Sequence, residues 1–143
     1  MIFQILYGFL ATTGFGILFN IPKRHIVEAG ISGAIGWAGY LTIMRVYGSS
    51  VGATFIASVL IGIMGEFFAR HTRNPVTIFI IPAIIPLVPG VTSYKAIKAL
   101  LDGRNKEALE LGILTAGIAL AIASGLILVI SFFRLRGQKQ KNQ

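Results

Sequence analysis

Long apolar runs alternate with short polar, mostly basic segments along this chain. Four runs approach the roughly 20 mostly apolar residues that a helix needs to cross the hydrocarbon core of a bilayer. They cover residues 2–21, 29–44, 51–69 and 111–133. Each run is followed by at least one arginine, within Pro22-Lys23-Arg24, at Arg45, from Arg70 on and from Arg134 on. The pattern predicts four spanning helices, of which 29–44 is short and rich in glycine.

A fifth apolar run, residues 75–90, differs from the others because it holds Pro75, Pro82, Pro86 and Pro89. Proline has no N–H to donate and interrupts a helix. Irregular backbone at membrane depth is tolerated where it faces protein or water. The run therefore predicts a broken or re-entrant helix. The fold class that follows is an all-α integral membrane protein with four to five transmembrane helices, including one proline-broken or re-entrant segment.

The character of the chain changes after residue 90. Thr92 or Ser93 is placed to cap a short amphipathic helix over about 93–101, which we expect to lie at the membrane interface. Asp102-Gly103 would end it, and Asn105 would cap the next helix.

Composition agrees with a membrane protein. The chain of 143 residues is 55% hydrophobic and 13% charged, with a mean hydropathy of +0.78, whereas soluble domains are about one quarter charged. So short a chain cannot bury that much apolar surface in water. We expect one transmembrane domain, residues 1–136, and a polar tail, 137–143.

The sequence lacks the residue patterns of several enzyme classes. It has no cysteine, which excludes disulfides and cysteine metal sites. Walker A and HExxH sequences are also missing, which argues against nucleotide hydrolysis and zinc-dependent proteolysis. We therefore expect no enzymatic activity, no cofactor and no metal.

The net charge is +8, but its placement argues against a nucleic-acid partner. The Lys and Arg residues lie between the apolar runs, where membrane topology and anionic headgroups explain them. If the N-terminus lies outside, eight of these Lys and Arg residues fall on the inner side of the membrane and five on the outer side. The count is the same whether residues 75–90 span the membrane or re-enter. The charges of the tail, which no acidic residue compensates, favour five spans over four.

The prolines also suggest a binding site. In a helix, Pro82, Pro86 and Pro89 would leave the carbonyls of Ile78, Pro82 and Ile85 without their N–H partners. The spacing puts these carbonyls on one face. Broken helices of secondary transporters use such groups to bind substrates and ions. The alternative is a structural kink whose carbonyls are satisfied by neighbouring side chains or water.

Glu66 is the acidic residue deepest in an apolar run, and it shares a helix face with Ser58 and Gly62. An intramembrane carboxylate is a candidate proton or substrate site. Arg70 follows four residues later, so an interfacial ion pair is the alternative. Both interpretations remain open at this point.

Small residues recur at helical spacing, as in Ser58 with Gly62 and in Gly117, Ala121 and Gly125. Such faces allow helices in lipid to approach closely, so we expect them to pack against other helices.

Other polar and aromatic residues have simpler expected roles. We expect His25 to be interfacial, Glu28 to stabilise a helix start, and Thr12 to hydrogen-bond to its own backbone. Trp37 and Tyr40 are expected to serve in packing and as interface anchors.

Three stretches resemble the threonine/serine exporter family, and more closely its small, YjjB-like subunit, over roughly residues 3–133. These are Gly14-Phe15 to Leu18-Phe19-Asn20-Ile21-Pro22, then Gly65-Glu66 to Arg70, and above all 82–90 (PAIIPLVPG) with Tyr94.

The resemblance implies export of small amino acids such as threonine and serine, or of related small carboxylates, driven by an ion gradient across the plasma (inner) membrane. It also implies a larger membrane subunit of the same family as partner. The substrate-binding candidates are Ile78, Pro82, Ile85, Pro86, Pro89, Gly90 and Tyr94, with Glu66 and Arg70 as a coupling or ion pair. A non-transporting membrane scaffold or a small oligomeric pore is the alternative function.

Overall fold

The computed structural model describes the backbone of residues 1–141 and the side chains of residues 1–135. The charges of Arg136, Lys139 and Lys141, which entered the topology argument, lie outside the described side chains. Of the predicted tail, the structure describes only the backbone up to residue 141.

The described chain is all α-helical, which confirms the predicted class. Its elements are α1 (Ile2–Leu18), the 3₁₀ turn η1 (Lys23–His25), α2 (Ile26–Tyr47), α3 (Ser50–Thr72), α4 (Thr77–Ile84), the 3₁₀ turn η2 (Ile85–Leu87), α5 (Gly90–Leu101) and α6 (Asn105–Lys141).

Three helical stretches are long and apolar enough to cross a membrane: Lys23–Tyr47, Ser50–Thr72 and Asn105–Leu135. The bent pair formed by Thr77–Leu87 and Gly90–Leu101 would make a fourth span. Helix α1 is apolar but has only 17 residues, or about 26 Å. It ends at Leu18, three residues before the predicted end, because Asn20 adopts a left-handed conformation with φ 54°.

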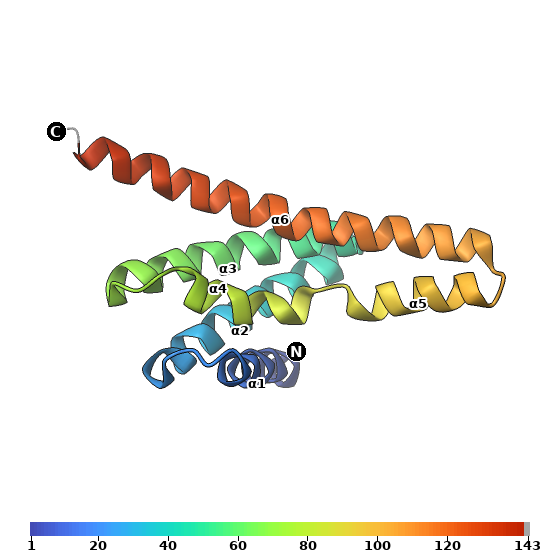
Figure 1. The fold of residues 1–143 in the computed structure, drawn as a ribbon, viewed down its shortest axis with the longest axis horizontal. Helices are drawn as coiled ribbons and strands as arrows, with labels where there is room; N and C mark the ends of the chain where they lie inside the picture. Colours follow the sequence, from blue (N-terminus) through green and yellow to red (C-terminus); the bar gives the residue numbers. More distant parts are fainter. Residues whose placement is uncertain (142–143) are drawn as a thin grey trace.

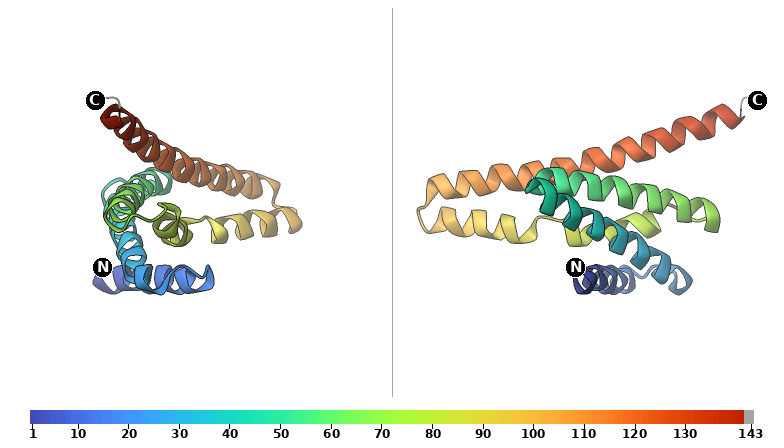
Figure 2. Two further views of the ribbon diagram at one scale, coloured as in Figure 1. Left: turned by 60° about the vertical axis from the view of Figure 1, so that its left-hand side comes forward. Right: turned by 180° about the vertical axis from the view of Figure 1, so that it is seen from behind.

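Helices α2 and α3 lie side by side, with α4 packed against both (Figure 1). Helix α6 follows α3 and continues past its start, where α5 accompanies it as a projecting helical hairpin. Helix α1 crosses α2 on the side away from α6 (Figure 2). The proline-broken segment is therefore enclosed by α1, α2, α3 and α6.

The break between η2 and α5 bends the chain by 44° without reversing it. Figure 1 shows the chain continuing in one general direction through α4 and α5 and returning only in α6. The bent pair is long and apolar enough to form one broken span or a re-entrant loop. The local cause of the bend is Val88, which is extended (φ −61°, ψ 131°) because the ring of Pro89 disfavours a helical residue before it.

Helix α5 begins at Gly90, and its N-cap position is occupied by Pro89. The prediction that Thr92 or Ser93 caps this helix is therefore wrong. Ser93 lies in the first turn, and its hydroxyl donates to the carbonyl of Pro89 at 2.6 Å. The proline already ends the preceding segment, so the helix starts as soon as the chain has passed it.

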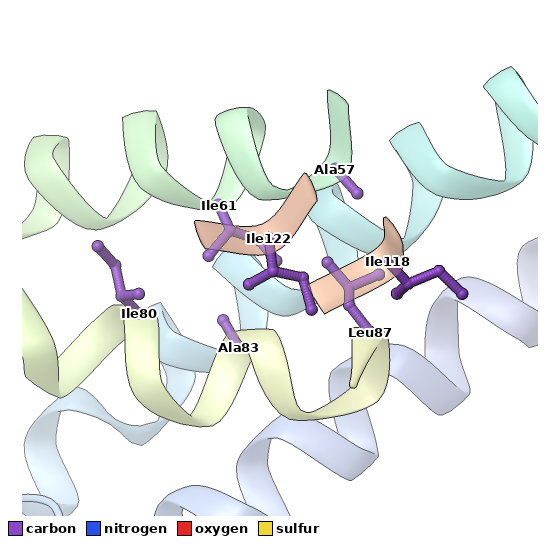
Figure 3. Packing of buried hydrophobic residues seen from close by; sticks show 7 residues of the cluster. All are labelled: Ala57, Ile61, Ile80, Ala83, Leu87, Ile118 and Ile122. Carbon is purple, nitrogen blue, oxygen red and sulfur yellow. The ribbon is translucent and has the colours of Figure 1, made fainter. Parts of the chain in front are cut away.

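The core lies where α3, α4, η2 and α6 meet (Figure 3). Its buried residues are Ala57, Ile61, Ile80, Ala83, Leu87, Ile118 and Ile122.

The small-residue faces pack α3 against α6, as predicted. The Ser58 hydroxyl donates to the carbonyls of Phe55 at 2.8 Å and of Ala121, across the interface, at 3.2 Å. A methyl group added to Gly125 would lie 3.0 Å from the carbonyl oxygen of Phe55, and one on Gly62 would lie 3.1 Å from Val129. Close approach at this interface therefore depends on the two glycines.

Candidate functional site

A cavity of about 290 Å³ lies at the break between η2 and α5. One wall is the break itself, and the others come from four helices. The lining residues are 86–89 of the break, Val91 and Thr92 of α5, Trp37 and Tyr40 of α2, Thr54 of α3 and Ile118 of α6.

Trp37 and Tyr40 form a stacked aromatic pair with ring centroids 5.1 Å apart and planes 17° apart. They are three residues apart on α2, so both side chains lie on one helix face. Trp37 and Pro86 also line a second cavity of about 350 Å³ on the α1 side, next to Tyr7 and Gly8. The aromatic pair and the break therefore lie between α1 and the cavity at α5.

The carbonyl of Ile85 accepts a hydrogen bond from the N–H of Val88 at 3.1 Å. The prediction that this carbonyl is free is wrong. The chain tightens into a 3₁₀ turn at η2, so the N–H three residues on replaces the donor that Pro89 lacks. A continuous row of three free carbonyls therefore does not form.

The break also places the first turn of α5 beside the cavity. The first N–H groups of a helix have no partner within it, and α5 starts at Gly90, beside the cavity. The Gly90 N–H is taken by the carbonyl of Val88 at 2.8 Å, and the Ser93 N–H by that of Pro89 at 2.9 Å. The N–H groups of Val91 and Thr92 lie between these two, and both residues line the cavity. The positive end of a helix dipole at this place favours an anionic group.

The structure separates the predicted substrate-binding residues. Pro86 and Pro89 line the cavity, whereas Pro82 is buried inside α4. Ile78 packs against the cluster of Ala29, Ala69 and Phe79.

Three other predicted residues do not line this cavity. Ile85 is half-buried, Gly90 is exposed, and Tyr94 is 66% exposed on α5. The structure thus brings two of the seven candidates to the cavity, and the binding roles of all seven remain proposals.

Sequence reasoning did not identify the far walls of the cavity. Trp37 and Tyr40 were assigned to packing, and Thr54 and Thr92 were given no binding role. The spacing of the two aromatic residues on one face of a helix is the signal that could have marked them. Nothing in the sequence indicates which face of α2 meets the break.

Glu66 and Arg70 form an ion pair, with Arg70 Nε 3.3 Å from Glu66 Oε2. Arg70 also donates to the carbonyl of Phe133 on α6 at 3.1 Å, and its guanidinium lies 4.9 Å from the centroid of the Phe133 ring. Neither charged residue lines the cavity. The geometry matches the ion-pair alternative. Through Arg70, the pair also connects the end of α3 to α6.

We expect Arg70→Ala to destabilise the protein more than Glu66→Gln. The first change removes the ion pair, the bond to the Phe133 carbonyl and the cation–π contact, whereas the second removes only the charge attraction. Hydrogen bonds of charged groups and cation–π contacts each contribute about 0.5–3 kcal/mol. Thermal unfolding in detergent measures the difference. An equal loss of stability, or a loss of export in Glu66→Gln without any loss of stability, would instead favour a coupling role for Glu66.

Two polar side chains are buried, and the hydrogen bond expected from Thr12 to its own backbone does not form. His25 is only 5% exposed, and its place at the membrane interface stays a prediction. Thr12 is completely buried, and its hydroxyl has no hydrogen-bond partner among the described residues, although neighbouring Thr13 donates to the carbonyl of Leu10 at 2.9 Å. The cause is close packing of α1 on α2, where the Thr12 side chain lies against Gly33.

Comparisons with known proteins give three findings. Residues 4–132 match the family model described as "Threonine/Serine exporter, ThrE", which confirms the family resemblance seen in the sequence. An uncharacterized protein of Haemophilus influenzae is 29% identical over 103 residues, which are 71% of this chain and 34% of that protein. The match thus spans about a third of the relative's length. No solved structure matches the chain significantly.

Proposed function

Because the chain belongs to the threonine/serine exporter family, we propose that it is the small subunit of a secondary-active exporter in the plasma (inner) membrane. Its substrates would be small amino acids such as threonine and serine, or related small carboxylates. The observation that carries the proposal is the cavity at the broken span, where a helix N-terminus meets an aromatic wall.

The chemistry of the cavity suits a small carboxylate. The N–H groups of Val91 and Thr92 offer donors at the positive end of α5, which is how half-helices of secondary transporters hold anionic substrate groups. The Thr92 hydroxyl and the Trp37–Tyr40 pair can select the remainder of the substrate. A volume of about 290 Å³ lies near the lower limit for ligand sites, about 300–1,000 Å³, and so favours small substrates.

The proposal includes a larger membrane subunit. Alternating access usually involves two bundles or repeats that move around a shared site, and this chain provides one bundle. It also matches only about a third of its Haemophilus influenzae relative. A partner of the same family, separate or fused, would supply the second bundle.

Export is tested in inside-out membrane vesicles that contain this chain, a larger membrane protein of the same family from the same organism, or both. We expect radiolabelled threonine, serine or a small dicarboxylate to accumulate only with both subunits and an imposed ion gradient. Equilibration without accumulation, independent of the gradient, would indicate a pore. If none of these substrates shows a flux above that of empty vesicles, an exporter of this class is contradicted. The non-transporting scaffold then remains as the alternative.

A further inference from the structure

A second polar cluster lies apart from the cavity, where η1, α2 and the α3–α4 connection meet. Its centre is His25, whose ring is buried and packs edge-on against Phe79 of α4, with ring centroids 5.6 Å apart. Glu28 of α2 and Asn74 of the connection face the two nitrogens of the imidazole.

The hydrogen bonds of Asn74 fix the protonation of the His25 ring. Asn74 Nδ2 lies 2.7 Å from the carbonyl oxygen of Thr72 and 3.1 Å from His25 Nε2. A carbonyl only accepts, so the atom facing it is the amide nitrogen, which donates to both neighbours. His25 Nε2 is therefore an acceptor, and the neutral ring carries its proton on Nδ1.

The other side of the ring is not satisfied. His25 Nδ1 lies 3.6 Å from Glu28 Oε1, which is too long for a hydrogen bond. His25 Nδ1 and Glu28 Oε2 are buried and have no hydrogen-bond partner among the described residues. Buried polar atoms without partners are rare in proteins, and a functional role is one explanation for them.

Binding of one proton would change this arrangement in a definite way. The neutral imidazole beside a carboxylate would become an imidazolium–carboxylate pair, with the new proton on Nε2. The new Nε2–H of His25 would then face an N–H of the Asn74 amide. Two hydrogen-bond donors would oppose each other. Asn74 would have to move away, or rotate its amide and turn its oxygen toward the carbonyl of Thr72. Either movement breaks a hydrogen bond.

Asn74 lies at the entrance to the broken span. It follows Arg73, a left-handed residue (φ 55°) that ends α3, and its own N–H donates to the carbonyl of Ala69 at 3.1 Å. After Asn74 the chain enters α4 and η2, which end at the cavity. Asn74 thus lies at the start of the segment that runs through α4 and η2, and the end of this segment forms one wall of the cavity. A movement of Asn74 would act on the start of the segment.

We propose that His25 and Glu28 form the proton-binding pair that couples transport to a proton gradient, and that Asn74 transmits its occupancy to the broken span. This inference rests on the exporter function proposed above. Glu28 is the carboxylate facing His25. Helix α4 has no titratable side chain, and that of α1 is Tyr7, which lies at the second cavity beside Trp37. Lys23 and Arg24, next to His25 in the chain, and Arg73, next to Asn74, are exposed cations.

Asn74→Asp tests the coupling with little change in shape. Aspartate accepts a hydrogen bond from the protonated Nε2, so it stabilises the imidazolium. We expect the pH dependence of gradient-driven export to move to higher pH. In His25→Gln we expect gradient-driven export to be lost while substrate counterflow, which needs no gradient, continues. His71→Gln is the control, because His71 is exposed and stacks on Phe67 of its own helix.

Two outcomes would overturn the inference while leaving the exporter intact: an unchanged pH profile in Asn74→Asp, or normal gradient-driven export in His25→Gln. A separate measurement does not depend on transport. NMR of the purified chain, labelled at the histidine rings and asparagine side chains, should show the Asn74 amide signals shifting with the His25 titration. Titration of His25 without any shift at Asn74 would overturn the inference, and absent counterflow in the wild-type complex would overturn the exporter function instead.

Discussion

Replacing both Pro86 and Pro89 by alanine is expected to lower export per assembled complex by roughly tenfold to a hundredfold. Both prolines line the cavity, and Pro89 keeps α5 from continuing the preceding helix. Alanine restores two N–H donors and permits a continuous helix. The N–H groups of Val91 and Thr92 would then bond to the carbonyls four residues earlier and no longer be available to a carboxylate. One or two hydrogen bonds to a charged group contribute about 1.5–3 kcal/mol each, and 1.4 kcal/mol is a factor of ten.

The measurement is the initial export rate in vesicles, divided by the amount of assembled complex. Pro75→Ala is the matched control, since Pro75 is exposed and lies at the other end of the segment, away from the cavity. A continuous helix is more stable than a broken one, so the double variant should insert normally. Normal export per complex in the double variant would show that the break is not part of the transport site.

Gly125→Ala is expected to destabilise the protein, whereas Gly112→Ala on the same helix is expected to stabilise it slightly. At Gly125 the new methyl group would meet the Phe55 carbonyl at 3.0 Å and the Ser58 side chain. It would force α6 away from α3 and strain the bond between Ser58 and Ala121. At Gly112 nothing lies within 4 Å of the added carbon, so only the better helix propensity of alanine acts.

Overpacking costs about 1–3 kcal/mol, and glycine to alanine in a helix gains about 1 kcal/mol. The gain in helix propensity is common to both variants, so they should differ by the overpacking cost of roughly 1–3 kcal/mol in unfolding free energy. Denaturation of the purified protein in mixed micelles measures it, and the matched chemistry cancels general effects of the substitution. If both variants show the same stability, the close approach of α3 and α6 at Gly125 does not contribute to folding.

The sequence by itself determined the all-α membrane class, because the apolar runs that form spans are a local property of the composition. It also determined that residues 75–90 would be interrupted, since proline lacks an N–H wherever it occurs. The sequence also indicated that the small-residue faces of Ser58 and Gly62 and of Gly125 would pack closely against other helices, whereas the pairing of α3 with α6 came from the structure. Small residues four positions apart define a face without knowledge of the partner helix.

The tertiary structure decided what the break faces and which of its groups are available. The crossing of α2 brings Trp37 and Tyr40 to the cavity, and a crossing angle is set by side-chain packing between helices distant in sequence. The 3₁₀ turn at η2 satisfies the carbonyl of Ile85 through the N–H of Val88, although Pro89 lacks the donor that an α-helix would use there. His25 stands beside two cations, which in the sequence suggested an interface. It is buried where Phe79 of α4 packs edge-on against its ring. Glu28 faces the ring from three residues further along the chain, but only the tertiary fold brings Asn74 to the other nitrogen.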